Sequence, residues 1–378
     1  MKTSNRKLKI VTLIGTRPEI IKLSRVIPHL DIHTNHKLVH TGQNHDYELN
    51  QVFFKDLDLR EPDHFLAASS TSASKTIAKV IENIEPILLK EKPDAFLVLG
   101  DTNSAFGALV AKKLRIPIFH MEAGNRCFDM RVPEEVNRKI IDHLSDINLP
   151  YTDIARNYLL AEGMHPSSII KTGSPMQEVI NYYMPAINQS TILQKLKLNT
   201  QKFFLVSCHR EENIENDILF HQFIESLHAI YAKYKLPILV STHPRMRNKL
   251  KKLNLKLNSN IIFHKPFAFS DYIKLMLSSH TVLSDSGTIT EEASILKIRA
   301  INIRETHERP EGSEEATCIL AGMNSQRIMQ SIKIISQDSN NSNFPKKIAD
   351  YDVDIVSKKV LRIILSHVDY VNKYFWRK

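Results

Sequence analysis

Residues 9–23 read KIVTLIGTRPEIIKL, a short apolar run followed at once by a turn and the beginning of a helix. The run 9–14 is rich in β-branched residues and predicts a buried strand. Gly15 suits a tight turn, and Pro18 is a residue that helices accept in their first turn. The stretch therefore predicts the strand-to-helix unit from which parallel sheets are built.

The same alternation continues along almost the whole chain. Apolar runs that predict strands lie within residues 9–15, 37–42, 95–101, 116–124, 147–152, 169–175, 203–209, 237–244, 260–267, 281–287 and 299–306. Segments with helical periodicity fill the gaps between them. The sequence therefore predicts an α/β protein with two Rossmann-like, doubly wound domains, whose strands direct their carboxyl ends to a cleft between the domains.

The domain boundaries follow from a break in this rhythm at residues 182–201, which contain Pro185 and a polar run. We expect an N-terminal domain over 1–184, a linker over 185–202 and a C-terminal domain over 203–350. The last stretch, 351–378, predicts an amphipathic helix that packs back on the N-terminal domain.

Composition excludes several classes of protein. The chain has 378 residues and is 42% apolar, enough for two real cores. Its first apolar run is too short and too soon charged for a signal peptide or a membrane span, so we expect a cytoplasmic protein without a membrane partner. Three cysteines without CxxC spacing make a disulfide framework or a zinc finger improbable.

The formal charge of +10 has an ordinary explanation. Much of the excess lies in residues 249–260 and in the last helix, where it fits solvated helix faces, and few aromatic residues are interleaved with it. We therefore expect no nucleic-acid partner. The chain contains neither GxGxxG nor a Walker loop, so it does not require a dinucleotide.

Polar clusters follow the strands of the first half. The motifs GTRPEIIKL, LGDTNS, HMEAGNR and RVPEEVNRKIIDH supply Arg17, Asp101, His120, Glu122, Arg126 and Glu134. Each one alone has a plain alternative role, such as an exposed turn arginine, an N-cap aspartate or an acid in the first turn of a helix. Three carboxylates at neighbouring strand ends favour proton transfer instead, because their repulsion raises the pKa of at least one.

The second half shows the same arrangement. SCHREENIEN, STHPRMRNK and NIRETHERPEG supply His209, His243 and Arg309, without the HxxxH or HxH spacing of a metal site. Residues 285–296, DSGTITEEASIL, predict a turn that opens into a helix. Its acids alone could serve the helix dipole. The amides of Ser286, Gly287 and Thr288 could instead hold a phosphate, with Glu292 accepting from ribose hydroxyls. The predicted ligand is a nucleoside diphosphate compound.

Seven motifs in one order, GTRPEIIKL, GDTNS, HMEAGNR, PEEVNR, CHREENI, DSGTITEE and ERPEG, resemble the non-hydrolysing UDP-N-acetylglucosamine 2-epimerase family over nearly the whole chain. The resemblance implies the two-domain GT-B fold. The stretches AGNRCFDMRVPEEVNR and SCHREENI are most similar to the capsule and O-antigen branch. That branch converts UDP-2-acetamido-2,6-dideoxy-L-talose to UDP-N-acetyl-L-fucosamine.

The resemblance implies a reaction and a set of residues. A base removes the C2 proton of the sugar while UDP leaves C1, and the resulting 2-acetamidoglycal is protonated on the opposite face as UDP returns. No cofactor is required, and a homodimer is expected. The implied catalytic residues are Asp101, Glu122, Glu134 and His209. The implied UDP contacts are Arg17, Lys22, Ser286, Gly287, Thr288 and Glu292, and His243 and Arg309 match further cleft positions.

Other functions stay open on the sequence. A UDP-N-acetylglucosamine 2-epimerase giving UDP-N-acetylmannosamine would use the same residues. A GT-B glycosyltransferase would hand the sugar to an acceptor, and a hydrolysing epimerase would release free N-acetylmannosamine. A non-catalytic nucleotide-sugar sensor would keep the diphosphate site without needing the acids.

Overall fold

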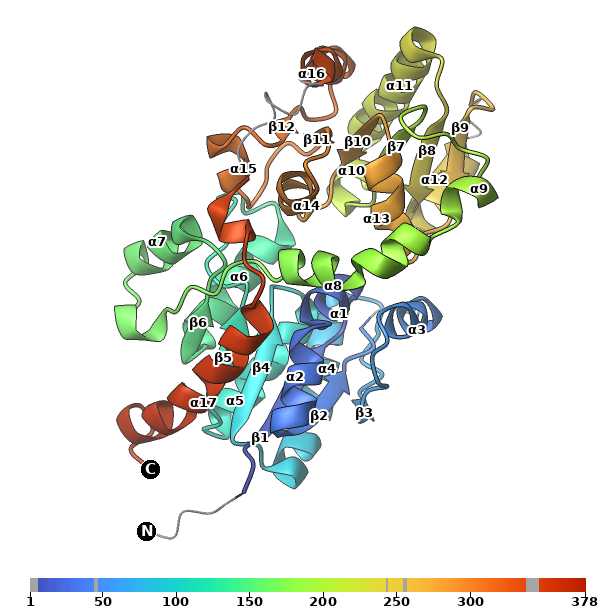
Figure 1. The fold of residues 1–378 in the computed structure, drawn as a ribbon. Helices are drawn as coiled ribbons and strands as arrows, with labels where there is room; N and C mark the ends of the chain where they lie inside the picture. Colours follow the sequence, from blue (N-terminus) through green and yellow to red (C-terminus); the bar gives the residue numbers. More distant parts are fainter. Residues whose placement is uncertain (1–5, 44–46, 243, 254–256, 338–346) are drawn as a thin grey trace. The chain divides into compact units, whose positions relative to one another are not determined.

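The computed structural model describes residues 6–43, 47–242, 244–253, 257–337 and 347–378. The chain divides into two compact units (Figure 1). Unit 1 contains Met1–Asn181 and Asp350–Lys378, and unit 2 contains Tyr182–Ala349. Each unit holds one six-stranded sheet in which every strand pair is parallel. The α/β class with two parallel sheets and flanking helices is confirmed.

Unit 1 is built around a sheet with the strand order β3-β2-β1-β4-β5-β6. Its strands are β1 Lys9–Ile14, β2 Asn35–His40, β3 His64–Phe65, β4 Ala95–Leu99, β5 Ile118–Met121 and β6 Ile147–Leu149. Its helices are α1 Arg17–Leu23, α2 Val26–His33, α3 Tyr47–Asp56, α4 Ala73–Glu91, α5 Gly107–Lys113, α6 Pro133–Leu144, α7 Asp153–Ala161, α8 Met176–Gln189, which runs on into unit 2, and α17 Val356–Tyr374.

Unit 2 repeats the pattern with the order β12-β11-β10-β7-β8-β9. Its strands are β7 Phe204–Cys208, β8 Ile238–Thr242, β9 Ile261–His264, β10 Thr281–Ser284, β11 Ala300–Asn302 and β12 Ile319–Leu320. Its helices are α9 Ile192–Lys195, α10 Glu211–Glu215, α11 Asp217–Tyr234, α12 Pro244–Leu253, α13 Phe269–Ser278, α14 Ile289–Leu296, α15 Glu311–Glu314 and α16 Ser325–Gln337.

The central strands are apolar because both faces of each sheet are covered. All five residues of β4 are buried, and Phe96 and Val98 join Val11 and Leu13 in a core that α4, α5 and α6 complete. In unit 2 the corresponding core contains residues of β7, β8 and α11. Burial of these apolar side chains is the main force that holds each sheet to its helices.

One predicted strand is wrong, two short edge strands were not predicted, and the expected linker contains helical residues. Residues 169–175 do not form a strand: Ile169 makes only an isolated bridge to Asn148, and a positive φ at Gly173 turns the chain away. The edge strands β3 and β12 were not predicted, because each has only two residues. Pro185 does not end its helix, so residues 185–202, expected as a linker, contain the end of α8 and all of α9.

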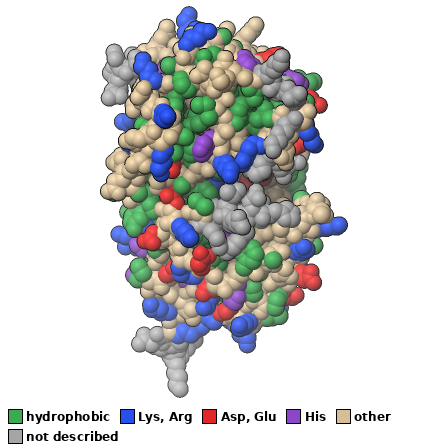
Figure 2. Space-filling model, turned by 90° about the vertical axis from the view of Figure 1, so that its right-hand side faces the viewer, with side chains coloured by type: hydrophobic (Ala, Val, Ile, Leu, Met, Phe, Trp, Pro, Cys, Tyr) green, Lys and Arg blue, Asp and Glu red, His purple; other side chains and the backbone are tan. Residues whose placement is uncertain are grey.

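The last helix, α17, packs against α2 within unit 1 (Figure 1). Its buried face includes Val360, Ile364, Val368 and Val371, which repeat at helical spacing. Among the described residues, no helix combines the length and the apolar character that crossing a membrane requires. On the face drawn in Figure 2, Lys and Arg side chains are scattered among acidic ones.

Candidate active site

In both sheets the strand order reverses between two neighbouring strands, the position where open α/β sheets bind ligands. In unit 1 these strands are β1 and β4, and in unit 2 they are β7 and β10. The turn Gly15–Arg17 follows β1, and Asp101 follows β4. His209 follows β7, and the turn 285–288 follows β10. Arg17, Asp101, His209 and residues 286–288 therefore follow the strands that flank the two reversal points, whereas Glu122 follows β5 and Glu134 lies on α6.

The turn after β1 packs closely on its neighbours. A Cβ atom at Gly15 would lie 2.0 Å from the hydroxyl oxygens of both Thr41 and Ser104. Those two hydroxyls bond to each other at 2.7 Å. Only glycine fits there, so the beginning of α1 is fixed against the chain that follows β2 and β4.

Glu19 joins the two turns at the reversal point of unit 1. Its side chain is buried and accepts hydrogen bonds from the amides of Gly15 and Thr16 and, at 2.6 Å, from the Thr102 hydroxyl. Burial, together with a smaller contribution from the nearby Asp101, raises the pKa of Glu19 to about 7 despite these donors. The residue was not predicted, although the spacing Thr16-x-x-Glu19 is a capping-box signature that could have identified it.

The structure brings two of the predicted residues, Lys22 and Glu122, into direct contact. The Lys22 ammonium, which is almost fully buried, forms a salt bridge with the Glu122 carboxylate and lies 5.9 Å from the centre of the Tyr151 ring. Arg17 is exposed at the first position of α1, with its guanidinium 5.5 Å from the centre of the Phe53 ring. Of the two predicted UDP contacts in unit 1, only Arg17 projects into solvent.

Asp101 is bound to the helix that carries Glu134. Arg138 of α6 donates from Nε to Asp101 Oδ2 at 2.7 Å and from a terminal nitrogen to Glu135 at 2.8 Å. Asn137 also donates to the main-chain oxygen of Asp101. Glu134 lies in the first turn of α6, partly exposed, beside the buried Glu135. Two of the expected carboxylates are therefore paired with cations: Asp101 with Arg138, which was not predicted, and Glu122 with Lys22, which was predicted to contact UDP instead.

In unit 2, Asp285 fixes the chain after β7. Its fully buried carboxylate accepts from the amides of His209 and Arg210 and from the side chain of Asn213, and it lies 2.8 Å from His209 Nδ1. Burial raises the pKa of Asp285, but His209 and the other donors outweigh it and hold that pKa well below its usual range. A carboxylate at Nδ1 orients the ring for proton transfer from its other nitrogen.

The turn after β10 leaves one amide for a ligand. The amides of Ser286 and Thr288 donate to the hydroxyls of Ser284 and Ser286, at 3.0 and 3.3 Å. Within the described part of the chain, no acceptor faces the amide of Gly287. Glu292 is buried and accepts from the Thr288 hydroxyl at 3.0 Å. The three amides predicted to hold a phosphate are therefore not equivalent.

Arg309 lies beneath this turn. It is almost fully buried, donates from Nε to the Gly287 oxygen at 3.2 Å and pairs with the buried Glu291 at 2.8 Å. Glu308 lies on the other side, where its Oε1 would be 2.4 Å from a Cβ atom at Gly287 and is 3.7 Å from the Arg210 guanidinium. Arg309 thus supports the turn, while Arg210, which was not predicted to contact the ligand, lies beside it.

His243 lies outside the described residues. Among the residues that are described, no group of three or more His, Cys, Asp and Glu side chains is arranged to hold a metal ion.

The described side chains in unit 1 can handle protons through carboxylates that are paired with cations. Those in unit 2 offer an oriented imidazole and a turn whose amide can bind an anion.

Comparisons with known proteins identify the family. Residues 29–365 match the family model for UDP-N-acetylglucosamine 2-epimerase. The structure of UDP-N-acetylglucosamine 2-epimerase from Rickettsia bellii is similar, with a TM-score of 0.92 and 49% identity, covering 99% of this chain and 100% of that one. The structure of Methanocaldococcus jannaschii UDP-GlcNAc 2-epimerase in complex with UDP-GlcNAc and UDP is similar too, with a TM-score of 0.88 and 33% identity. The match covers 95% of this chain and 100% of that one.

A relative with another substrate name is also similar in sequence. The UDP-2,3-diacetamido-2,3-dideoxy-D-glucuronate 2-epimerase of Pseudomonas aeruginosa is 33% identical over 86% of this chain and 92% of its own. The family model covers most of the chain, and the matched relatives are covered over nearly their full lengths. The chain therefore belongs to the non-hydrolysing UDP-N-acetylglucosamine 2-epimerase family of isomerases.

Proposed function

We propose that this isomerase epimerises C2 of a UDP-2-acetamido sugar by eliminating UDP and adding it back. The observation that carries the proposal is the difference between the two reversal points. In unit 1, Asp101 follows β4 and pairs with Arg138, and Glu122 follows β5 and pairs with Lys22; in unit 2, the His209–Asp285 pair and the Gly287 amide lie at the reversal point. In the proposed reaction, residues of both units act on one substrate molecule.

The proposed steps are balanced within the substrate and the side chains. A carboxylate takes the C2 proton, the C–H electrons form the C1=C2 double bond, and the C1–O bond breaks with its electrons leaving on UDP. A second group then protonates C2 from the other face while UDP attacks C1. Asp101, Glu122 and Glu134 are proposed for the two proton transfers.

Stabilising the departing diphosphate is the other requirement of this reaction. We assign it to His209, to the amide of Gly287 and to Arg17, which is exposed at the first position of α1. Ser286, Thr288 and Glu292 are proposed to contact UDP through side chains, and His243 is retained from the family resemblance. Lys22 is proposed to act through its salt bridge to Glu122, and Arg309 through its hydrogen bond to the turn at Gly287.

For the sugar, we propose UDP-2-acetamido-2,6-dideoxy-L-talose, converted to UDP-N-acetyl-L-fucosamine for capsule or O-antigen synthesis. The similarity of residues 123–138 to that branch supports it. Within this stretch, Phe128 and Met130 expose apolar side chains on the loop between Glu122 and Glu134, which suits a methyl group better than a hydroxymethyl group. The name of the similar Rickettsia bellii protein, UDP-N-acetylglucosamine 2-epimerase, favours UDP-N-acetylglucosamine as the alternative.

The test incubates the purified enzyme in deuterated water with each of these two UDP-sugars, without acceptor or NAD. Mass spectrometry and NMR follow deuterium at C2, the epimer and free sugar. Deuterium in substrate and product of the deoxy sugar alone supports the proposed substrate, and the reverse pattern supports the alternative. Release of free N-acetylmannosamine, or the absence of exchange and epimer with both sugars, would reject the proposed reaction.

We also propose a cytoplasmic homodimer. Light scattering of the full chain after size-exclusion chromatography tests the dimer: a mass of one chain at assay concentration contradicts it. Fractionation of the producing cells tests the compartment.

A further inference from the structure

The loop after β5 has an unusual backbone. Glu122 adopts a positive φ of 65°, and Phe128 one of 56°, with Gly124 at 81° between them. For residues other than glycine this left-handed region is unfavourable, and it persists only where the surroundings hold the chain. A strained loop that begins at a proposed catalytic acid therefore needs an identifiable support.

Arg126 provides buried contacts at the middle of this loop. Its side chain is completely buried, and it donates two parallel hydrogen bonds to Glu162, at 2.8 and 2.6 Å. A third bond reaches Asp142 at 2.7 Å, and a fourth reaches the main-chain oxygen of Asn125 at 2.8 Å. Burial lowers the pKa of Arg126, but the two carboxylates outweigh it and raise that pKa, so the guanidinium is charged.

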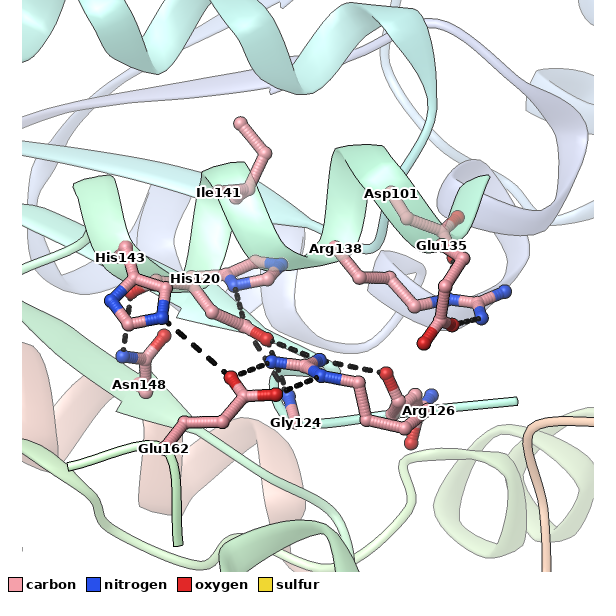
Figure 3. Close-up of polar contacts among 12 residues, drawn as sticks. Asp101, His120, Gly124, Arg126, Glu135, Arg138, Ile141, His143, Asn148 and Glu162 are labelled. Atoms are coloured by element: carbon pink, nitrogen blue, oxygen red, sulfur yellow. Dashed lines mark hydrogen bonds and ion pairs between the residues drawn. The ribbon is translucent and has the colours of Figure 1, made fainter. Parts of the chain in front are cut away.

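Asp142 connects Arg126 to the segments that carry two of the three proposed acids, Glu122 and Asp101. Its carboxylate accepts from the amide of Gly124, two residues after Glu122. It also lies 3.0 Å from Nδ1 of His120, whose Nε2 donates to the main-chain oxygen of Gly100 at 2.9 Å. Because a carbonyl only accepts, Nε2 carries a proton, and Nδ1 donates to the Asp142 carboxylate when the ring is protonated on both nitrogens. Figure 3 shows Glu162 against the Arg126 guanidinium, with His120 and Gly124 nearby.

A separate pair of hydrogen bonds holds the end of the loop at Cys127 and Phe128. The buried Glu135 accepts from the amides of Cys127 and Phe128, at 3.0 and 3.2 Å, and is itself held by Arg138. The loop is thus held by two carboxylates of α6, one of which depends on Arg126 and the other on Arg138.

We propose that Arg126 is a positioning residue, which holds the backbone of Glu122 through Asp142 and, through Asp142 and His120, the strand end that carries Asp101. This inference rests on the proposed function, which assigns proton transfer to Glu122 and Asp101. Small displacements of these carboxylates lower the rate, because a proton is transferred only when the carboxylate oxygen lies close to C2 of the sugar. Binding of UDP, assigned mainly to unit 2, does not depend on this network.

The test compares Arg126→Lys and Arg126→Met with the wild type. Lysine keeps the charge but cannot make the parallel bonds to Glu162. Arg60→Lys is the matched control, because Arg60 makes an equivalent paired contact with Asp31 within unit 1, on a segment without proposed catalytic residues. Three quantities are measured: kcat and KM for C2 epimerisation, the affinity for UDP by calorimetry, and amide hydrogen exchange in peptides covering 98–103 and 120–128.

For both Arg126 variants we expect kcat to fall by about tenfold to a hundredfold, with KM and UDP affinity within about twofold of the wild type. Amide exchange should rise in both peptides. Arg60→Lys should leave kcat and both peptides unchanged. If Arg126→Met does not fold, Glu162→Gln replaces it, because the Glu162 side chain is partly exposed and glutamine keeps only one oxygen to accept the two parallel bonds of Arg126.

Two results would overturn the proposal: unchanged exchange in residues 120–128 of Arg126→Lys, or a loss of UDP affinity as large as the loss of kcat. An unchanged kcat beside increased exchange would also overturn it, because the loop would then move without consequence. If the wild type itself shows no exchange at C2, the proposed function fails, while the amide exchange still decides whether Arg126 holds the loop.

Discussion

Replacing Glu19 by glutamine should make the stability of unit 1 less sensitive to pH. The pKa of Glu19 is raised from its ordinary value of 4.5 to about 7 because the buried carboxylate loses its hydration. The protonated form is therefore favoured on folding. Its contribution to stability is complete below the unfolded pKa and is lost as the pH rises through the folded pKa.

The size of the effect follows from the shift. A shift of about 2.5 units corresponds to about 3 kcal/mol, of which about 2 kcal/mol should be lost between about pH 5.5 and about pH 8.5. The Glu19→Gln side chain can still accept from the amides of Gly15 and Thr16, and its NH₂ group can donate to the Thr102 hydroxyl. The variant should therefore fold and lose only the titration.

The assay is urea unfolding of both proteins across this pH range, with a fluorescence or circular-dichroism signal. The difference in unfolding free energy, variant minus wild type, should increase by about 2 kcal/mol in favour of the variant from the lower to the higher pH. Glu82→Gln, at an exposed position of α4, is the control and should give a constant difference. A constant difference for Glu19→Gln as well would refute the argument that burial determines its pKa.

Three further predictions concern the proposed site. Glu134→Gln should lower kcat by about a hundredfold or more while UDP affinity by calorimetry changes little; equal losses in both would contradict a proton-transfer role. Gly287→Ala should weaken UDP binding by about tenfold or more, because the new Cβ would meet Glu308 Oε1 at 2.4 Å and shift the turn. Wild-type affinity would mean that the turn adapts or does not bind. Arg309→Met should lower the free energy of unfolding by about 3–5 kcal/mol, because it removes the guanidinium from beside the buried Glu291. A loss below about 1 kcal/mol in urea unfolding would show that other groups compensate for that charge.

Short edge strands show why local sequence patterns were insufficient for part of the fold. The central strands are long apolar runs and were predicted from the sequence. β3 and β12 have two residues each, and their assignment depends on hydrogen bonds to a neighbouring strand that is remote in sequence. Residues 169–175 show the reverse case, since their apolar start predicts a strand but the turn at Gly173 ends the pairing.

By itself, the sequence determined the α/β class, the placement of polar motifs at strand ends and the family, because alternating apolar runs and ordered motifs are local properties of the chain. Only the tertiary structure decided which of those side chains are buried and which charges they meet. Glu19, Asp142 and Glu291 look like ordinary helical acids in the sequence. Their pairing with donors and cations from distant segments depends on how the strands are ordered in each sheet, and no short stretch of sequence records that order.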